Sequence, residues 1–477
     1  MSVAILLAAS QPAAARQDST GAASPARSLT LQVEKAATAQ APAGVKVLTL
    51  EQALAIAAAQ NRDVQKAIEY KNWVQGKYVE ERAAALPQGT FTTSFTRNFD
   101  DTTAKLFSGF MEGGDSGSGS SGDTPDLGEI FGGRQDVVSG SFGVRQVLFT
   151  WGQVGAAIRA AKLGFEFSDQ QIRRFRQAVV KDVTGAFYNV LAARELVRIA
   201  EQNVAQRARR LDEVTRRRDA GTATDYDVLA ARVELDSAKP AVIRTQNAVR
   251  AAREQLRFLL AEPQEVDVDG ALASPVEPVP AYDALLATAF QHRPEIGEIN
   301  TTQGIYAEMI KIAASGNKPR VDFAADWGKR RLGLPSISST GTAWDFGVYA
   351  TVPLFNGWRT KGQVAQVRST LASVDIDELK LREGITLEVR TAVDSAREAV
   401  ALLDALTGPV TQAEQLLFLA EKGFELGVKT RLEVQDAEQN VNTARANLAV
   451  AQRDYRLARV NLDWVAGILD GSAAPIK

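Results

Sequence analysis

The sequence predicts a mainly helical protein with a small β part, built from two copies of one long-helix unit. Three observations predict it: an internal repeat, a seven-residue apolar period in four long segments, and four short segments in which apolar and polar residues alternate. A repeat has to be sought first, because it decides how every other element is counted. The 477 residues carry 55 Lys and Arg against 57 Asp and Glu, so net charge gives no bias toward nucleic acid.

The repeat is clearest at two tight turns that lie 206 residues apart. The stretch AGTATDYDVLAA at 220–231 is matched by LGVKTRLEVQDA at 426–437. Earlier in each half the offset is about 232, so the first half carries an insertion, which the Gly- and Ser-rich stretch 112–129 supplies; its role is left unassigned. The predicted divisions are a first repeat at 48–260, a Pro-rich linker at 261–281, a second repeat at 282–469 and a C-terminal tail at 470–477.

The first residues contain a short apolar run, 3–9, followed by the small-residue stretch 13–15. This pattern is typical of the end of a secretory signal peptide. We therefore interpret residues 1–47 as a signal-peptide remnant with an N-terminal tail, and a disordered Ala-rich tail is the alternative.

Each repeat is expected to hold two long helices: 153–220 and 222–260 in the first, 357–426 and 428–467 in the second. The first of them spans about 100 Å, and two shorter helices stacked end to end, 63–86 and 222–260, would match it. Pro240 and Pro409 fall inside helical patterns and are expected to kink or locally break them.

A strict seven-residue spacing over five successive positions favours coiled-coil packing along one seam of each helix. The seam positions are Val183, Val190, Val197, Val204 and Leu211; Val228, Leu235, Val242, Val249 and Leu256; Val389, Ala396, Leu403, Val410 and Leu417; and Val434, Val441, Leu448, Tyr455 and Leu462.

Four segments, at about 90–99, 136–149, 319–331 and 343–355, alternate apolar and polar residues and carry aromatics near their ends. Segments of about ten residues with this pattern are typical of transmembrane β-barrel strands. Two soluble hairpins packed on a core are the alternative. A lipid-facing barrel needs about eight strands or more, so a barrel would require an oligomer.

The composition argues against an enzyme or a metal protein. The chain has no Cys, three Met and one His, His292, so it offers no disulfide, no metal-ligand cluster and no Ser/His/Asp set. No phosphate-binding Gly motif follows a strand, and we expect no cofactor. His292 is interpreted as a residue at a helix joint, with Asn61 as its counterpart in the first repeat.

Motifs at the ends of the predicted helices carry a family resemblance. VLFTWG and PLFNGW lead into the long helices, and the duplicated Gly turns join them; over about 48–469 the chain resembles the TolC-type outer-membrane efflux proteins. The first corner departs from the pattern, with Val147 where the second has Pro353.

The resemblance implies a homotrimer in the outer membrane of a Gram-negative bacterium. Twelve strands, four from each chain, would form a barrel in the lipid, and twelve long helices would form a periplasmic tunnel. It also implies a passive, gated exit duct for drugs, toxic solutes or polypeptides, working in a tripartite efflux pump or a type I secretion system. The partners would be a periplasmic adaptor and an inner-membrane transporter, with no nucleic acid. The alternative is a periplasmic coiled-coil scaffold without a channel.

The resemblance places a constriction near the inner helices after each Gly turn. Glu433 and Asp436 lie three residues apart, and threefold symmetry would turn them into two acidic rings that favour cations. Helix capping is the competing interpretation, because acidic residues in a first turn complement the helix N-terminus. Capping alone explains Glu433 more readily than Asp436.

By the same resemblance, Lys429, Phe424, Tyr226 and Asp227 would hold the closed tip together. Lys429 stands where an arginine is usual, and a lysine cannot form the bidentate fork.

The turn residues Gly221, Thr222, Gly427 and Val428 would receive the adaptor. Both glycines also have a structural reason, since a left-handed Gly ends a helix at low cost. The basic run 207–218 is interpreted as a solvated helix face.

Overall fold

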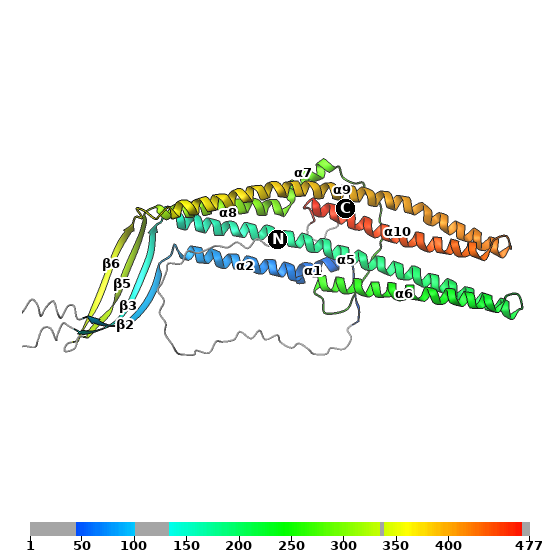
Figure 1. Ribbon diagram of the computed structural model, residues 1–477, viewed down its shortest axis with the longest axis horizontal. Coiled ribbons are helices and arrows are strands. Elements are labelled where there is room, and N and C mark those ends of the chain that lie inside the picture. The colour runs from blue at the N-terminus through cyan, green and yellow to red at the C-terminus, as the bar shows by residue number, and fades with distance from the viewer. Residues whose placement is uncertain (1–43, 101–132, 334–337, 470–477) are drawn as a thin grey trace, which may run out of the picture. The chain divides into compact units, whose positions relative to one another are not determined.

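The computed structural model describes residues 44–100, 133–333 and 338–469. Residues 1–43 of the expected signal-peptide remnant, the Gly- and Ser-rich stretch 112–129 and the expected C-terminal tail lie outside the described residues. Figure 1 shows the elements. The helices are α1 (Leu50–Gln60), α2 (Arg62–Ala83), α5 (Gln153–Asp219), α6 (Asp225–Leu260), α7 (Tyr282–His292), α8 (Pro294–Ala314), α9 (Arg359–Glu425) and α10 (Arg431–Val465). The strands are β1 (Lys46–Leu48), β2 (Gln88–Asp100), β3 (Gly133–Phe149), β4 (Val266–Val268), β5 (Arg320–Gly333) and β6 (Ser338–Thr351).

Two helical hairpins organise the fold. α5 packs against α6, α9 packs against α10, and α10 also contacts α5, so the order across the layer is α6, α5, α10, α9. α2 lies along the first half of α5, and α8 lies between α5 and α9. The end-to-end stacking predicted for the first repeat is therefore confirmed: α2 and α6 both pack along α5, and Asn61 Nδ2, at the start of α2, donates to Leu259 O near the end of α6 at 2.9 Å.

The seven-residue seams form the contacts within these hairpins. Every seam position is buried or half-buried, and none is exposed. Val183, Val190, Leu256, Val389 and Leu462 are at most 1% exposed. Long helices gain most of their stability from such packing rather than from propensity, so the predicted period accounts for why two very long helices form.

The helices begin and end where their caps lie. α6 begins at Asp225 and α10 at Arg431, three residues later than expected, because Thr224 and Thr430 are the N-caps and keep extended backbones. The expected local break at proline is wrong, since α6 and α9 continue through Pro240 and Pro409, and the alternative, a kink, stays a prediction. One proline removes one backbone donor, and the packing on either side keeps the helix.

A four-stranded antiparallel sheet, in the order β2-β3-β5-β6, joins the N-terminal ends of α5 and α9. The strands differ at their ends from the expected segments, most clearly in β6, which ends at Thr351, two residues before Pro353. Since a proline cannot donate to a ladder, pairing stops ahead of it. Among the helices that the structure describes, none has a stretch long and apolar enough to cross a membrane.

The joint between α7 and α8 corrects one predicted pairing. Asn61 is the N-cap of α2, and the equivalent N-cap of α8 is Arg293, with almost the same backbone angles (φ −60°, ψ 132° against φ −66°, ψ 126°). His292 is the last residue of α7, and its Nδ1 lies 3.1 Å from Thr288 O. His292 therefore lies at a joint, as expected, but Asn61 corresponds to Arg293.

Candidate functional site

The first Gly turn closes the α5–α6 hairpin. Gly221 has a φ of +79°, its N–H donates to Arg218 O at 2.8 Å, and Thr222 N donates to Arg217 O at 2.8 Å. This pair of hydrogen bonds is the usual way in which a left-handed glycine ends a helix. Because the turn needs only three residues before the next N-cap, α6 runs back along α5 at once.

Asp227 then fixes the start of α6. Its Oδ2 accepts from Thr224 N at 2.9 Å and from Thr224 Oγ1 at 2.8 Å, while Asp227 N donates back to Thr224 Oγ1 at 3.3 Å. The hydrogen bond from the Thr224 backbone lowers the pKa of the Asp227 carboxyl. Asp227 thus occupies the acidic place of a capping box.

The second turn repeats this construction. Gly427 has a φ of +74°, and Val428 N donates to Gly423 O at 2.9 Å. Glu433 Oε2 accepts from Thr430 N at 2.7 Å and Thr430 Oγ1 at 3.0 Å, and Lys429 Nζ donates to Glu433 Oε1 at 2.6 Å. The Lys429 ammonium, followed by the two Thr430 donors, lowers the pKa of Glu433 to about 2.

The two predicted ring carboxylates therefore differ in their surroundings. Both oxygens of Glu433 are engaged within its own turn, so capping accounts for its position, and its negative charge is partly balanced by Lys429. Asp436 is exposed and lies one helical turn further along α10. Residues three apart share a helix face, so both carboxylates lie on the same side of α10. Their role in a ring stays a prediction.

The predicted latch residues are not paired with one another in this chain. Asp227 binds Thr224, and Lys429 binds Glu433, each within its own turn. Tyr226 is 79% exposed. Phe424 has a partner from the other hairpin, since the guanidinium carbon of Arg217 lies 5.6 Å from its ring centroid.

Lys429 is positioned by a glycine that sequence reasoning did not single out. A Cβ added at Gly423 would lie 2.5 Å from Lys429 Cγ, so the lysine stem crosses α9 at a point where there is no side chain. The absence of a side chain at Gly423 therefore lets the Lys429 ammonium reach Glu433.

A cluster of charges joins the two hairpins further from the turns. Arg431 of α10 lies 3.9 Å from Glu234 of α6, and Arg207 of α5 donates to Glu234 O at 3.3 Å. Burial lowers the pKa of Arg210 and raises the pKa of Glu438 within the same cluster. Arg207 and Arg210 are half-buried, so the interpretation of the run 207–218 as a solvated face is wrong for these two residues.

Exposed apolar side chains surround both turns. The large ones are Tyr226, Leu229 and Val233 beside the first turn and Leu426, Val428 and Leu432 beside the second, each at least 60% exposed. Such a cluster at a helical tip is unusual for a surface without a partner. Within the described residues there is no group of three or more His, Cys, Asp or Glu side chains that could hold a metal ion.

Comparisons with known proteins agree with this geometry. A profile of the family described as "Outer membrane efflux protein" matches residues 53–262 and 285–467. The chain is 23% identical to the outer membrane protein TolC of Escherichia coli over 310 residues, which cover 62% of each chain. It is 24% identical to the alkaline protease secretion protein AprF of Pseudomonas aeruginosa over 311 residues, 64% of each chain. Both matches span less than two thirds of the relative's length.

The fold is also that of solved outer membrane channels. The structure of the open state of the MtrE outer membrane channel of Neisseria gonorrhoeae superimposes with a TM-score of 0.69 at 20% identity, covering 89% of this chain and 91% of MtrE. With the family profile matching most of both repeats, the chain belongs to the outer membrane efflux protein family, whose members are channel components of the Gram-negative outer membrane and not enzymes.

Proposed function

We propose that three copies of this chain form an outer-membrane channel-tunnel, the passive and gated exit duct of a tripartite efflux pump or a type I secretion system. The observation that carries the proposal is the four-stranded sheet with two open edges. Neither β2, with 13 residues, nor β6, with 14, has a further strand on its outer side among the described residues. Long unprotected edges invite pairing with another chain.

The surface of the sheet supports a lipid environment. Large apolar side chains are exposed on all four of its strands, among them Phe91 and Phe95 on β2, Phe142 on β3, Trp327 on β5, and Trp344, Phe346 and Val348 on β6. Four strands are too few to close a barrel, but twelve strands from three chains are enough. The edge of β6 would then pair with the edge of β2 in the next copy.

The helical layer supports the tunnel in the same way. α6, α5, α10 and α9 lie side by side, and the Gly turns lie at the ends of α5 and α9 furthest from the sheet (Figure 1). Three such layers would form a tube with the six turns at its periplasmic mouth. Glu433 and Asp436 would form two acidic rings there, and the exposed apolar residues at the turns would receive the hairpin of a periplasmic adaptor.

The cargo would be drugs, toxic solutes or polypeptides, driven by an inner-membrane transporter that reaches the duct through the adaptor. The relatives' names cover both uses, because AprF is described as an alkaline protease secretion protein and ArpC of Pseudomonas putida as an antibiotic efflux pump outer membrane protein. Neither name selects a substrate for this chain.

Cell fractionation combined with planar-bilayer recording tests the proposal. The full chain should sediment with the outer membrane, migrate as a trimer that heating converts to monomer, and conduct ions after reconstitution. A chain found in the soluble periplasmic fraction, with no conductance, would favour the coiled-coil scaffold instead.

A further inference from the structure

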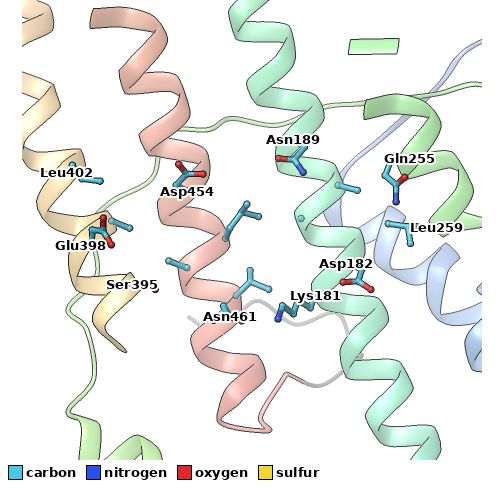
Figure 2. Close-up of a pocket in the computed structure, with 16 residues that line it drawn as sticks. Lys181, Asp182, Asn189, Gln255, Leu259, Ser395, Glu398, Leu402, Asp454 and Asn461 are labelled. Carbon is cyan, nitrogen blue, oxygen red and sulfur yellow. The ribbon is translucent and has the colours of Figure 1, made fainter. Parts of the chain in front are cut away.

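The four long helices enclose an open groove of about 830 Å³ near the end of α6, which we call the mid-helix groove (Figure 2). It is lined by side chains of α5, α6, α9 and α10, so all four columns of the helical layer contribute to it. Its acidic residues are Asp182, Glu398 and Asp454, and its large apolar residues are Leu259, Leu402, Leu457 and Val460. The groove lies far from the Gly turns, and none of its lining residues is among the proposed gate residues.

The groove faces one defined side of the layer. Four of its five lining residues on α10, Asp454, Leu457, Ala458 and Asn461, are spaced as one helix face. The opposite face of α10 is covered by the linker between the repeats. There Tyr455, Arg456 and Arg459 donate hydrogen bonds to the backbone carbonyls of Pro275, Leu272 and Pro278. A tube made of three layers has room for the linkers only on its outer side, so the groove would face the axis.

The charges of the groove favour a cation. Asp182 on α5 and Glu398 on α9 stand on opposite sides of it (Figure 2) and have no hydrogen bond or ion pair with any described residue. Asp454 already accepts two hydrogen bonds from Arg453. Lys181 is the one basic residue among the lining side chains.

The ammonium group of Lys181 has a partner outside the groove. Lys181 Nζ lies 3.6 Å from the centroid of the Trp464 ring, and Trp464 is not among the residues that line the groove. An ammonium held over an indole face is attracted there by the ring quadrupole. The charge of Lys181 still acts on Asp182, so Glu398 is the lining carboxylate most open to a ligand.

An apolar extension continues the groove along α9 and α10. A smaller pocket of about 240 Å³ shares Ala399, Leu402 and Asp454 with it and adds Leu406 and Val450. Leu402 is 48% exposed at the boundary. Together the two hollows offer carboxylates beside an aliphatic surface, the combination that suits a flat or elongated apolar cation.

We propose that the mid-helix groove binds organic cations with an apolar body and is a holding site on the inner wall of the duct. The site rests on the proposed function, because only in the trimeric tunnel does the groove face the exported cargo. The cationic end would contact Asp182 or Glu398, and the apolar body would cover Leu402 and Leu457.

Fluorescence anisotropy on the purified full chain in detergent tests this assignment. The probe is rhodamine 6G, an aromatic monocation, and fluorescein is the anionic comparison. We expect rhodamine 6G to bind the unaltered chain and the D182N/E398Q double variant to bind it at least about fivefold more weakly, since each carboxylate contributes a near charge pair. Leu402→Ala should also weaken binding, without any change in charge.

The matched control is Glu383→Gln, which removes an exposed carboxylate from α9 outside the groove and should leave the affinity unchanged. Circular dichroism and trimer migration establish that each variant is folded, and E398Q alone replaces the double variant if that one fails to fold. Equal affinity of the variant and the unaltered chain, or equal binding of fluorescein, would overturn the assignment.

Conductance separates this proposal from the function on which it rests. If the chain conducts in bilayers but the dye binds the variants as well as the unaltered chain, the groove assignment fails and the channel stands. If dye binding depends on the two carboxylates and no preparation conducts, the channel and the holding role inside it fail, and only the cation site stands.

Discussion

Arg217 at the end of α5 lies over the ring of Phe424 at the end of α9, with 5.6 Å between the guanidinium carbon and the ring centroid. The two residues belong to different repeats and different hairpins. Their contact joins the two Gly turns of one chain, where the gate is proposed to open, so separating the hairpins has to break it.

Phe424→Leu keeps an apolar side chain but removes the aromatic face. An exposed cation–π contact contributes about 0.5–1 kcal/mol, so we expect the channel to occupy its open state about two- to fivefold more often in planar-bilayer recordings. Arg217→Gln should have the same effect. Arg216→Gln is the control, because Arg216 pairs with Asp212 of its own helix. An equal rise in the control would assign the effect to charge alone.

The acidic rings can be tested without damaging the helix cap. Glu433→Gln removes the charge and keeps an acceptor for Thr430, since Gln also completes a capping box. We expect the cation-over-anion permeability ratio, measured from reversal potentials, to fall in E433Q and to fall further in E433Q/D436N. Glu425→Gln, which removes a carboxylate paired with Lys422 on α9, should change the permeability ratio little. Unchanged selectivity in the double variant would refute the rings.

The pH dependence of Glu433 follows from its depressed pKa. The folded value is about 2 against an ordinary 4.5, mainly because of Lys429. The ion pair and cap are therefore fully present above about pH 4.5 and are lost as the pH falls through about 2. We expect the difference in selectivity between the unaltered chain and E433Q to stay constant from pH 7 to about pH 4. A difference that disappears near pH 5 would contradict the Lys429 contact.

Glu298 should make the fold less stable as the pH rises. Its Oε1 lies 3.2 Å from Arg174 Nε, yet that buried oxygen has no hydrogen bond, and burial raises the pKa of Glu298 to about 7. The folded chain thus binds this proton more tightly than the unfolded chain, and the free energy of unfolding falls between about pH 4.5 and pH 7.

Glu298→Gln should remove that fall and raise the unfolding free energy at pH 8 by up to about 3 kcal/mol, measured by denaturant unfolding at several pH values. Glu166→Gln replaces an exposed carboxylate on α5. Its free energy of unfolding should change with pH in the same way as that of the unaltered chain. A pH-independent offset in E298Q would show that the carboxylate is charged throughout.

Gly467 combines a left-handed backbone with close backbone neighbours. Its φ is +72°, and an added Cβ would lie 2.7 Å from Arg293 N and 2.8 Å from the carbonyl carbon of His292. Because both neighbours are backbone atoms, Gly467→Ala should destabilise the chain by more than about 2 kcal/mol, seen as a lower thermal midpoint. Gly384→Ala, where nothing lies within 4 Å of the new Cβ inside α9, should stabilise by about 0.5–1 kcal/mol.

Local pattern was enough to predict the long helices and their packing. Each seam residue from Val183 to Leu462 repeats at seven, and a period decides which face is buried whatever the partner is. The Gly turns were equally readable, since Gly221 and Gly427 are followed by Thr N-caps with an acidic residue three places on. The helix starts were misplaced by three residues because the cap, rather than the glycine, begins the next helix.

Contacts between the hairpins could not be predicted in the same way. Arg217 and Phe424, or Glu234 and Arg431, are brought together by the order α6, α5, α10, α9, which no local period encodes. Asp227 and Lys429 were assigned to the closed tip by resemblance. In a single chain each of them forms its contacts within its own turn. Sequence reasoning located the tip, whereas the pairing within it depends on how the helices are placed.

α2 meets the end of α6 at Asn61, and α8 meets the end of α10 where Gly467 lies against the backbone of Arg293. These two end-to-end junctions affect how mechanical load would pass along the molecule. α5 and α9 continue without interruption past both junctions, whereas their neighbours change over at Asn61 and at Arg293. A torque applied at the periplasmic turns would therefore reach the sheet through α5 and α9, the two uninterrupted helices of each chain. At the junctions each shorter column is held by a few hydrogen bonds, such as the one from Asn61 to Leu259. In the proposed duct the shorter columns would therefore yield at these junctions, whereas α5 and α9 would carry a rotation of the lower half on toward the sheet.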